Sequence, residues 1–290
     1  MASVAELYYY PVKSCRAVSL NEVTVDSFGF ENDRRFMFVR GNGRFLSQRQ
    51  EPRLATIKAT ITTTGRRIDR LRLESSLVEN ALEIRPRFDG ETIDVSVWED
   101  RVRGVDQGVE AAEWLRGILR TDSVHNRLVA VPDKDYRRDV ELPKSFPSVP
   151  HSQLSFTDAG PLLLLSEKSL EDLNRRLEER TGETVPMSRF RPNIVVAGCD
   201  EPYEEDTWLL IQIGAVPFMS YRKATRCKMT GVDQESGEVD KIGPLEILRE
   251  YRAPRGPGKA EFGQLLVPLT TGGTVSVGDP VKVLDRKKTT

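Results

Sequence analysis

One cysteine in the second half of the chain lies among positive charges. Cys227 is flanked by four cationic side chains, Arg222, Lys223, Arg226 and Lys228. Positive charge near a thiol favours the thiolate, which is the form that binds a metal or attacks an electrophile. Soft thiolate sulfur suits a soft or high-valent metal centre. The alternative is a buried structural cysteine in a strand, which is the commoner role of a lone cysteine.

Three other segments carry polar side chains beside stretches typical of strands. Arg191 and Asn193 lie on either side of a proline, and the two-residue period of a strand points both the same way. Together they could grip a phosphate or the edge of a pterin, or the arginine could pair with a carboxylate and brace the strand. Lys13 and Ser14 follow the first strand, where they could hold an anion. Asp158 precedes an apolar stretch and could belong to a functional site. Its spacing fits an aspartate of a turn or helix cap equally well.

Signatures of several other protein classes are absent. His125 and His151 have no partner at metal-ligand spacing, so zinc is not expected. The chain has no phosphate-binding loop, no dinucleotide-binding glycine motif and no serine-nucleophile elbow. Its 43 basic residues are balanced by 44 acidic ones, and a net charge of −1 argues against nucleic acid as a partner.

Cysteine content and hydropathy indicate the compartment. Three cysteines, Cys15, Cys199 and Cys227, are an odd number in a chain of 290 residues that shows no signal peptide. This favours free thiols and a reducing, cytoplasmic setting. No apolar stretch approaches the roughly 18 residues needed to cross a bilayer, so no transmembrane anchor is expected in this chain. Association with mitochondria, and the removal of a targeting segment, are left open.

Turn signals and periodicity predict the elements that must position these residues. In residues 1–100 we expect mainly strands, over 7–12, 20–25, 35–39, 54–62, 82–85 and 92–97. Such strands favour a small barrel or sandwich. Helices are predicted over 108–119, 167–180 and 244–252, with Ser166 capping the second and Gly182 ending it. Residues 132–153 form a linker or long loop, 162–165 and 193–197 buried strands, and 209–221 and 275–284 hairpins.

A series of short motifs makes the chain resemble the MOSC superfamily, the domain shared with molybdenum-cofactor sulfurases. The first half contributes Tyr-Pro-Val-Lys-Ser-Cys (10–15), Asp-Arg-Arg-Phe-Met (33–37) and Arg-Gln-Glu-Pro-Arg-Leu (49–54). The second half contributes Arg-Phe-Arg-Pro-Asn-Ile-Val-Val (189–196), Glu-Glu-Asp-Thr-Trp (204–208), Arg-Cys-Lys-Met-Thr-Gly-Val-Asp (226–233), Phe-Gly-Gln (262–264) and Val-Gly-Asp-Pro-Val (277–281). Each motif is weak alone, but their joint order is specific and covers nearly the whole chain. Within the superfamily the chain is most similar to the amidoxime reducing components.

The resemblance implies a β-rich α+β fold with few flanking helices. An N-terminal MOSC-type β-barrel domain over 1–130 would pack against a MOSC β-barrel domain over 131–290 that binds the molybdenum cofactor, a molybdopterin. Cys227 would be the protein ligand to molybdenum, and Asp158 a catalytic residue that handles protons near the open metal face. The remaining cofactor contacts would be Lys13, Ser14, Arg34, Thr157, Ala159, Gly160, Arg191, Asn193, Thr225 and Arg226. The family often has hydroxyl residues where this chain has Ala159 and Gly160, so contacts there would use backbone N–H groups.

The implied activity is the reduction of small N-hydroxylated compounds: amidoximes, hydroxylamines and N-hydroxylated base analogues, with nitrite as a further candidate. Electrons would come from a cytochrome b-type haem protein fed by an NADH-dependent flavin reductase. No cysteine-rich segment follows Val283, so no iron–sulfur cluster is expected, and the membrane anchor of the animal proteins is not expected either. Two other functions stay open. Cys227 could carry a persulfide in a sulfurtransferase, or the chain could bind and deliver the cofactor without catalysis.

Overall fold

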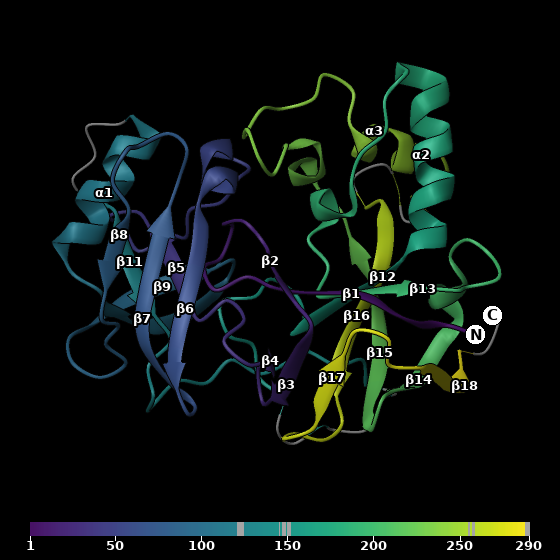
Figure 1. Ribbon diagram of the computed structural model, residues 1–290, viewed down its shortest axis with the longest axis horizontal. Helices are drawn as coiled ribbons and strands as arrows, with labels where there is room; N and C mark the ends of the chain where they lie inside the picture. Colours follow the sequence, from purple (N-terminus) through teal and green to yellow (C-terminus); the bar gives the residue numbers. More distant parts are fainter. Residues whose placement is uncertain are drawn as a thin grey trace.

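The structure is a computed structural model that describes residues 1–120, 125–144, 146, 149, 152–254, 256 and 259–287. Within these ranges β-strands dominate, and three α-helices lie outside the sheets (Figure 1). The β-rich α+β class predicted from the sequence is therefore confirmed. None of these helices is both long enough and apolar enough to span a bilayer. His151 lies outside the described residues.

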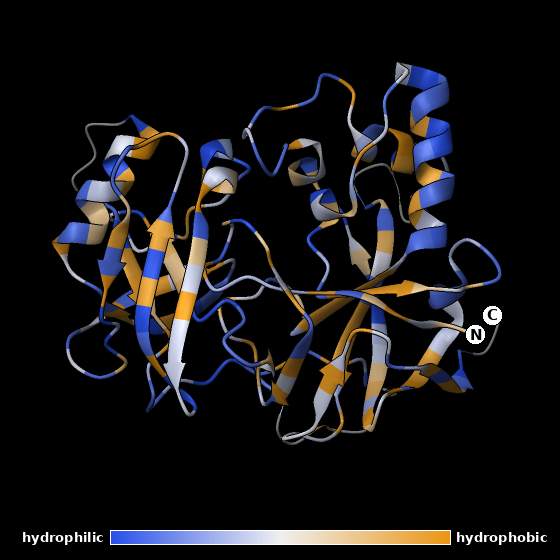
Figure 2. Cartoon of the chain, in the orientation of Figure 1, coloured by the Kyte–Doolittle hydropathy of each residue, from blue (hydrophilic) through white to orange (hydrophobic). Residues whose placement is uncertain are grey.

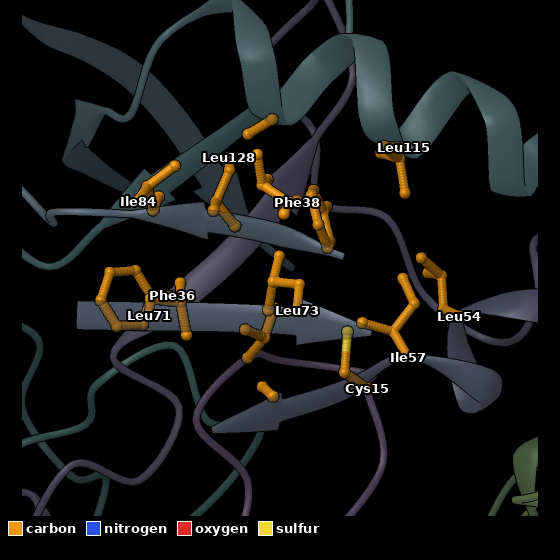
Figure 3. Close-up of a cluster of buried hydrophobic side chains, with 14 of the residues drawn as sticks. Cys15, Phe36, Phe38, Leu54, Ile57, Leu71, Leu73, Ile84, Leu115 and Leu128 are labelled. Atoms are coloured by element: carbon orange, nitrogen blue, oxygen red, sulfur yellow. The ribbon is translucent and has the colours of Figure 1, made fainter. Parts of the chain in front are cut away.

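The N-terminal body, on the left of Figure 1, consists of two curled sheets around a shared core. One sheet has the order β5 (Phe36–Val39), β11 (Arg127–Ala130), β10 (Asp100–Asp106), β9 (Thr92–Val97). The other has the order β6 (Lys58–Thr64), β7 (Arg67–Glu74), β8 (Leu82–Ile84). Helix α1 (Val109–Leu119) covers this core, and Figure 3 shows Phe38, Leu73 and Leu128 pointing into it below Leu115. The alternating apolar residues of these strands supply the buried face.

The C-terminal body is built on one eight-stranded sheet. Its order is β18 (Val281–Arg286), β14 (Trp208–Ile213), β15 (Val216–Thr225), β16 (Glu261–Pro268), β12 (Leu162–Ser166), β13 (Ile194–Ala197), β1 (Ser3–Tyr9), β2 (Val18–Leu20). A smaller sheet has the order β17 (Thr274–Ser276), β3 (Glu22–Asp26), β4 (Gly29–Phe30). Helices α2 (Glu167–Thr181) and α3 (Pro244–Tyr251) pack against each other, and α2 turns a hydrophilic surface outward (Figure 2).

Local signals place helix α2 correctly. The Ser166 hydroxyl accepts a hydrogen bond from the Ser169 N–H at 3.1 Å, which satisfies one of the free donors at the helix start. Gly182 adopts a φ of 76° directly after the helix, a conformation that costs glycine little. Both predicted boundaries are confirmed, and the helix follows directly from β12.

Strand β1 joins the sheet of the C-terminal body although it begins the chain. It pairs antiparallel with β13, with Leu7 opposite Ile194. The chain then crosses to the N-terminal body, where Val12 bridges Phe36 of β5. This crossing places the residues that follow Val12 at the boundary between the two bodies. The division of the chain at residue 130 stays a prediction, because strands of the first 30 residues pair with strands of the second half.

Two predicted elements are wrong. Residues 275–284 do not form a hairpin, because β17 pairs with β3 while β18 pairs with β14. Residues 54–62 do not form one strand. A 3₁₀ helix over Pro52–Thr56 buries Leu54, and β6 starts only at Lys58. Proline at the start of that turn favours a helical backbone, which outweighs the apolar pattern that follows it.

Candidate active site

A cavity of about 400 Å³ lies where the two bodies meet. All twelve residues predicted from the sequence line it: Lys13, Ser14, Arg34, Thr157, Asp158, Ala159, Gly160, Arg191, Asn193, Thr225, Arg226 and Cys227. Residues without a predicted role also line it, among them Arg49, Trp98, Arg189, Phe190, Met229 and Thr230. The structure thus brings the predicted residues together from segments far apart in sequence. Their individual roles toward a cofactor stay predictions.

Three of the lining residues have a backbone conformation that side chains other than glycine rarely adopt. The φ angles of Ser14, Arg34 and Arg191 are 65°, 47° and 57°. Such positions cost on the order of 1–3 kcal/mol each and cluster at functional sites. Each lies in a tight turn beside a strand: Ser14 after the crossing from β1, Arg34 before β5, and Arg191 before β13. These turns direct the side chains into the space between the bodies.

Arg34 and Arg191 stack against the same aromatic ring. Their guanidinium carbons lie 4.1 and 4.3 Å from the centre of the Tyr10 ring, whose hydroxyl donates to the Pro192 carbonyl at 2.8 Å. Arg191 donates to the Cys15 carbonyl at 2.6 Å and to the Gln234 side chain at 2.9 Å. Uncharged oxygens, rather than the strand-bracing carboxylate considered from the sequence, therefore accept these bonds. The positive charge of Arg191 therefore remains available to a bound anion.

Asn193, directly before strand β13, supports this arrangement. Its side-chain oxygen accepts hydrogen bonds from Arg34 at 2.9 Å and from the Leu163 N–H at 3.2 Å, and its amide group donates to the Tyr8 carbonyl at 3.1 Å. The Asn193 side chain is therefore hydrogen-bonded to strand β12, to strand β1 and to Arg34. This is consistent with a residue that shapes the cavity wall as well as lining it.

Cations outnumber carboxylates on the cavity wall. The lining cations are Lys13, Arg34, Arg49, Arg189, Arg191 and Arg226, and Asp158 is the lining carboxylate among the described residues. Two of these cations also pair with carboxylates that do not line the cavity, Arg34 with Asp33 and Arg189 with Asp240. Burial lowers the pKa of Arg191, and it lowers the pKa of Arg226 to about 10, which shows how poorly protein and solvent compensate these charges. A multiply charged anion would stabilise such a wall.

Three buried polar atoms of the lining residues have no hydrogen-bond partner among the described residues. They are Thr157 Oγ1, Arg189 Nε and Arg226 Nε. A buried polar atom without a partner costs about 1–3 kcal/mol, so native proteins rarely leave one. Unpaired atoms on the wall of one cationic cavity indicate a ligand with several hydrogen-bonding atoms and negative charge. A pterin with a phosphate and anionic sulfur atoms has these properties.

Cys227 lies on this wall between β15 and a 3₁₀ helix over Lys228–Gly231. It is partly exposed, whereas the other two cysteines, Cys15 and Cys199, are buried, and all three are free. The cation that contacts its sulfur is one that the sequence did not single out. Arg49 Nε–H donates to Cys227 Sγ at 3.3 Å.

The cations flanking Cys227 in the sequence mostly point elsewhere. Arg222 donates to the Ala159 carbonyl at 3.2 Å, and Lys223 pairs with Asp206 at 2.9 Å. Only Arg226 of the four lines the cavity. The sequence argument that neighbouring charges activate the thiol thus needs correction, because Arg222 and Lys223 are bound to other groups.

Asp158 is held by three side chains from the N-terminal half of the chain. Lys13 Nζ forms an ion pair with it, Trp98 Nε1–H donates to it at 3.0 Å, and Arg49 Nη2 lies 3.6 Å from its other oxygen. Burial raises the pKa of Asp158, but the charges of Lys13 and Arg49 lower it more, so the pKa lies below its ordinary value. The carboxyl is therefore ionised at neutral pH. For the proton-handling role expected of Asp158, a carboxylate that accepts or orients a proton fits this ionisation better than a proton donor does.

Lys13 is the buried partner of this pair. Its side chain is only 6% exposed, and Nζ also donates to the Phe156 carbonyl at 2.8 Å. Burial lowers the pKa of Lys13 to about 8, against the opposing effect of Asp158. The segment carrying Asp158 is fixed from behind by Arg138, which donates to the carbonyls of Ser155, Thr157 and Asp158 at 3.1, 2.5 and 3.0 Å.

The glycine at position 160, where the family often has a hydroxyl residue, has a steric explanation. A Cβ at Gly160 would lie 2.6 Å from Tyr221 Oη and 3.2 Å from Leu265 Cβ. The same hydroxyl donates to the Ala159 carbonyl at 2.6 Å, and Tyr221 is buried. This chain therefore uses glycine where Tyr221 closes the back of the cavity wall.

Gly160→Ala is expected to lower the free energy of unfolding by about 1–3 kcal/mol, because the new methyl group forces Tyr221 away from its hydrogen bond. Chemical denaturation measures the effect. Tyr221→Phe removes the clashing oxygen, so the double variant should lose less stability than the sum of the two single variants. Strictly additive losses would show that the Tyr221 hydroxyl is not the reason for glycine at this position.

Comparison with known proteins agrees with this architecture. The MOSC N-terminal beta barrel domain matches residues 1–122, and the MOSC domain matches residues 151–282. The chain is 35% identical to mitochondrial amidoxime-reducing component 1 of Mus musculus, over 98% of this chain and 83% of that protein. The Homo sapiens protein of the same name gives the same three values. Mitochondrial amidoxime reducing component 2 of Bos taurus is 32% identical, over 97% of this chain and 83% of its own length.

Fold, domains and relatives define a MOSC-domain protein. Within that class, the chain belongs to the family of amidoxime-reducing components.

Proposed function

We propose that this protein is a molybdenum-cofactor-dependent reductase of small N-hydroxylated compounds such as amidoximes, hydroxylamines and N-hydroxylated base analogues. The observation that carries the proposal is the cationic cavity with a free, partly exposed cysteine on its wall. The names of the relatives support the same class of reaction.

The residues present fit the molybdenum cofactor. Cys227 supplies a soft sulfur ligand for the metal. Arg34, Arg191 and Arg226, together with Lys13, supply positive charge and N–H donors for the phosphate and the pterin. Thr157 Oγ1 and Arg226 Nε, which have no hydrogen-bond partner among the described residues, would find acceptors on the cofactor. Such a cofactor supplies the two electrons that remove oxygen from an N-hydroxylated substrate.

The chain's own part in the reaction is to orient substrate and proton at the mouth of the cavity. Asp158 is 45% exposed there, and Trp98 is 47% exposed beside it. An ionised carboxylate can accept a hydrogen bond from the N–OH or amine group of a bound substrate. The exposed indole offers apolar contact to the rest of the molecule. Lys13 keeps the carboxylate in place from the interior.

Electrons must reach the cavity from outside, and we propose a cytochrome b-type haem protein fed by an NADH-dependent flavin reductase as the donor system. Three free cysteines support a reducing intracellular setting. The relatives are named as mitochondrial components, and we propose association with mitochondria for this chain as well.

The test is elemental analysis combined with turnover. Protein purified from a host that makes the cofactor is expected to hold about one molybdenum per chain and to reduce an aromatic amidoxime to the amidine, with a chemically reduced dye as electron donor. Absence of both molybdenum and pterin would contradict the proposal. Bound molybdenum without turnover, whatever the electron donor, would favour a cofactor carrier. A persulfide on Cys227 without molybdenum would favour a sulfurtransferase.

A further inference from the structure

Arg49 is the cation that contacts the sulfur of Cys227, and it comes from the opposite body of the protein. Its Nε–H donates to Sγ at 3.3 Å, and its side chain is 15% exposed. The turn that carries it is closed by hydrogen bonds from the N–H groups of Gln50 and Glu51 to the Ser47 carbonyl, at 3.1 and 2.9 Å. The contact therefore joins a fixed turn of the N-terminal body to the wall of the C-terminal body.

Three further contacts orient the guanidinium group. Its carbon lies 4.4 Å from the centre of the Trp98 ring, Nη2 lies 3.6 Å from Asp158 Oδ2, and Nη1 donates to Ser47 Oγ at 3.3 Å. Because these contacts use the face and the outer nitrogens, Nε–H is left to point at the sulfur. A residue that supplied only positive charge would not need this orientation.

The backbone of Trp98 adds to this evidence. Trp98 follows strand β9 with a φ of 59°, which is rare for a large side chain, and it is 47% exposed. In that position the ring covers Arg49, and its Nε1–H reaches Asp158 at 3.0 Å. The strained turn thus places the indole against Arg49 as well as against Phe45, whose ring centre lies 5.4 Å away.

We propose that Arg49 is a positioning residue for Cys227, whose Nε–H orients the ligand sulfur and draws electron density from it. The inference rests on the proposed function, since it assumes that this sulfur is a metal ligand. Hydrogen bonds to a ligand sulfur are among the features by which proteins tune a metal centre. A donor that withdraws electron density favours the reduced metal. Loss of the donor should therefore make the centre harder to reduce.

The experiment compares the cofactor-loaded wild type with R49K, R49A and R53A. Lysine at position 49 keeps the charge but lacks both the Nε–H donor and the planar group that stacks on Trp98. Arg53 is the matched control, because it lies four residues further along and its Nη1 donates to the Leu119 carbonyl at 3.4 Å, outside the cavity. The measurements are molybdenum content, the electron paramagnetic resonance spectrum of the half-reduced metal, its midpoint potential, and kcat and KM.

We expect R49K and R49A to show altered resonance parameters and a lower midpoint potential. Their kcat should fall by about 10–100-fold with KM changed less, as for other groups that support a metal ligand. R53A should match the wild type throughout. Loss of molybdenum from both Arg49 variants, with R53A fully loaded and all proteins folded, would also support the proposal, because lysine retains the charge.

A wild-type spectrum and potential in R49K and R49A would overturn the inference. So would a loss of metal in R49A alone with an unchanged R49K, since charge would then suffice. Wild-type protein without molybdenum would contradict the proposed function itself, so the two failures are distinguishable.

Discussion

Cys227→Ala is expected to abolish molybdenum-dependent reduction while leaving the protein folded. Removing a group that only supports a metal ligand already costs about 10–100-fold in activity or metal affinity, so loss of the ligand itself should exceed 100-fold in kcat/KM. The side chain is partly exposed, and its sulfur accepts one hydrogen bond, from Arg49. Its removal leaves no large cavity in either core, and the free energy of unfolding should change by about 1 kcal/mol or less.

Cys199→Ala provides the control for this prediction. Cys199 is a free thiol buried in the core of the C-terminal body, among residues that include Trp208 and Val196. Its replacement should cost more stability than that of Cys227 but leave activity and molybdenum content unchanged. Metal analysis, the visible absorption spectrum and thermal unfolding of the two variants separate the roles. If Cys227→Ala kept wild-type turnover and spectrum, the metal-ligand assignment would be wrong.

Local signals in the sequence were sufficient where an element is defined by its own residues. Helix α2 was predicted between Ser166 and Gly182 because a hydroxyl cap and a left-handed glycine act within one turn. Strand β7 was missed for the opposite reason. Arg67–Glu74 carries charged residues on its exposed face, and only Ile68, Leu71 and Leu73 reveal the buried face. The hairpin assigned to 275–284 failed because pairing depends on strands distant in the chain.

The cavity shows the same division between local and distant information. Similarity to a known family placed twelve residues that the structure brings together, but it said nothing about which side chains touch. Arg49 lay in a quoted motif without a role, because its contact with Cys227 spans 178 positions. Trp98 had a usable signal, since it directly follows the strand predicted over 92–97, yet its contacts with Arg49 and Asp158 also depend on the packing of the two bodies.

Asp158→Asn is expected to lower kcat by about 100-fold or more, which is the lower range for loss of a group that assists proton transfer. The pKa of Asp158 lies below its ordinary value because Lys13 and Arg49 outweigh the effect of burial. The carboxylate thus contributes stability above an unfolded pKa of roughly 3.9 and loses it as the pH falls through the lower folded value. Between pH 5 and 7 the wild-type activity should therefore show no limb from this group.

The Asp158→Asn substitution should change the alkaline limb of the pH–activity profile. Burial lowers the pKa of Lys13 to about 8, and the charge of Asp158 opposes that effect. Without the carboxylate, Lys13 loses its proton at lower pH, so a limb near pH 8 should move in the acidic direction in Asp158→Asn. Asp172→Asn is the matched control. Asp172 lies on helix α2 and pairs with Arg175 and Arg176, each at 2.9 Å, outside the cavity, so its removal should leave the limb in place.

The same profile distinguishes the two roles open to Asp158. A proton donor would give the wild type an acidic limb in the neutral range that disappears in Asp158→Asn. An ionised carboxylate that orients substrate gives a lower kcat at every pH and a shift only of the Lys13 limb. The ion pair with Lys13, the hydrogen bond from Trp98 and the nearby Arg49 all stabilise the ionised form, so we expect the second pattern.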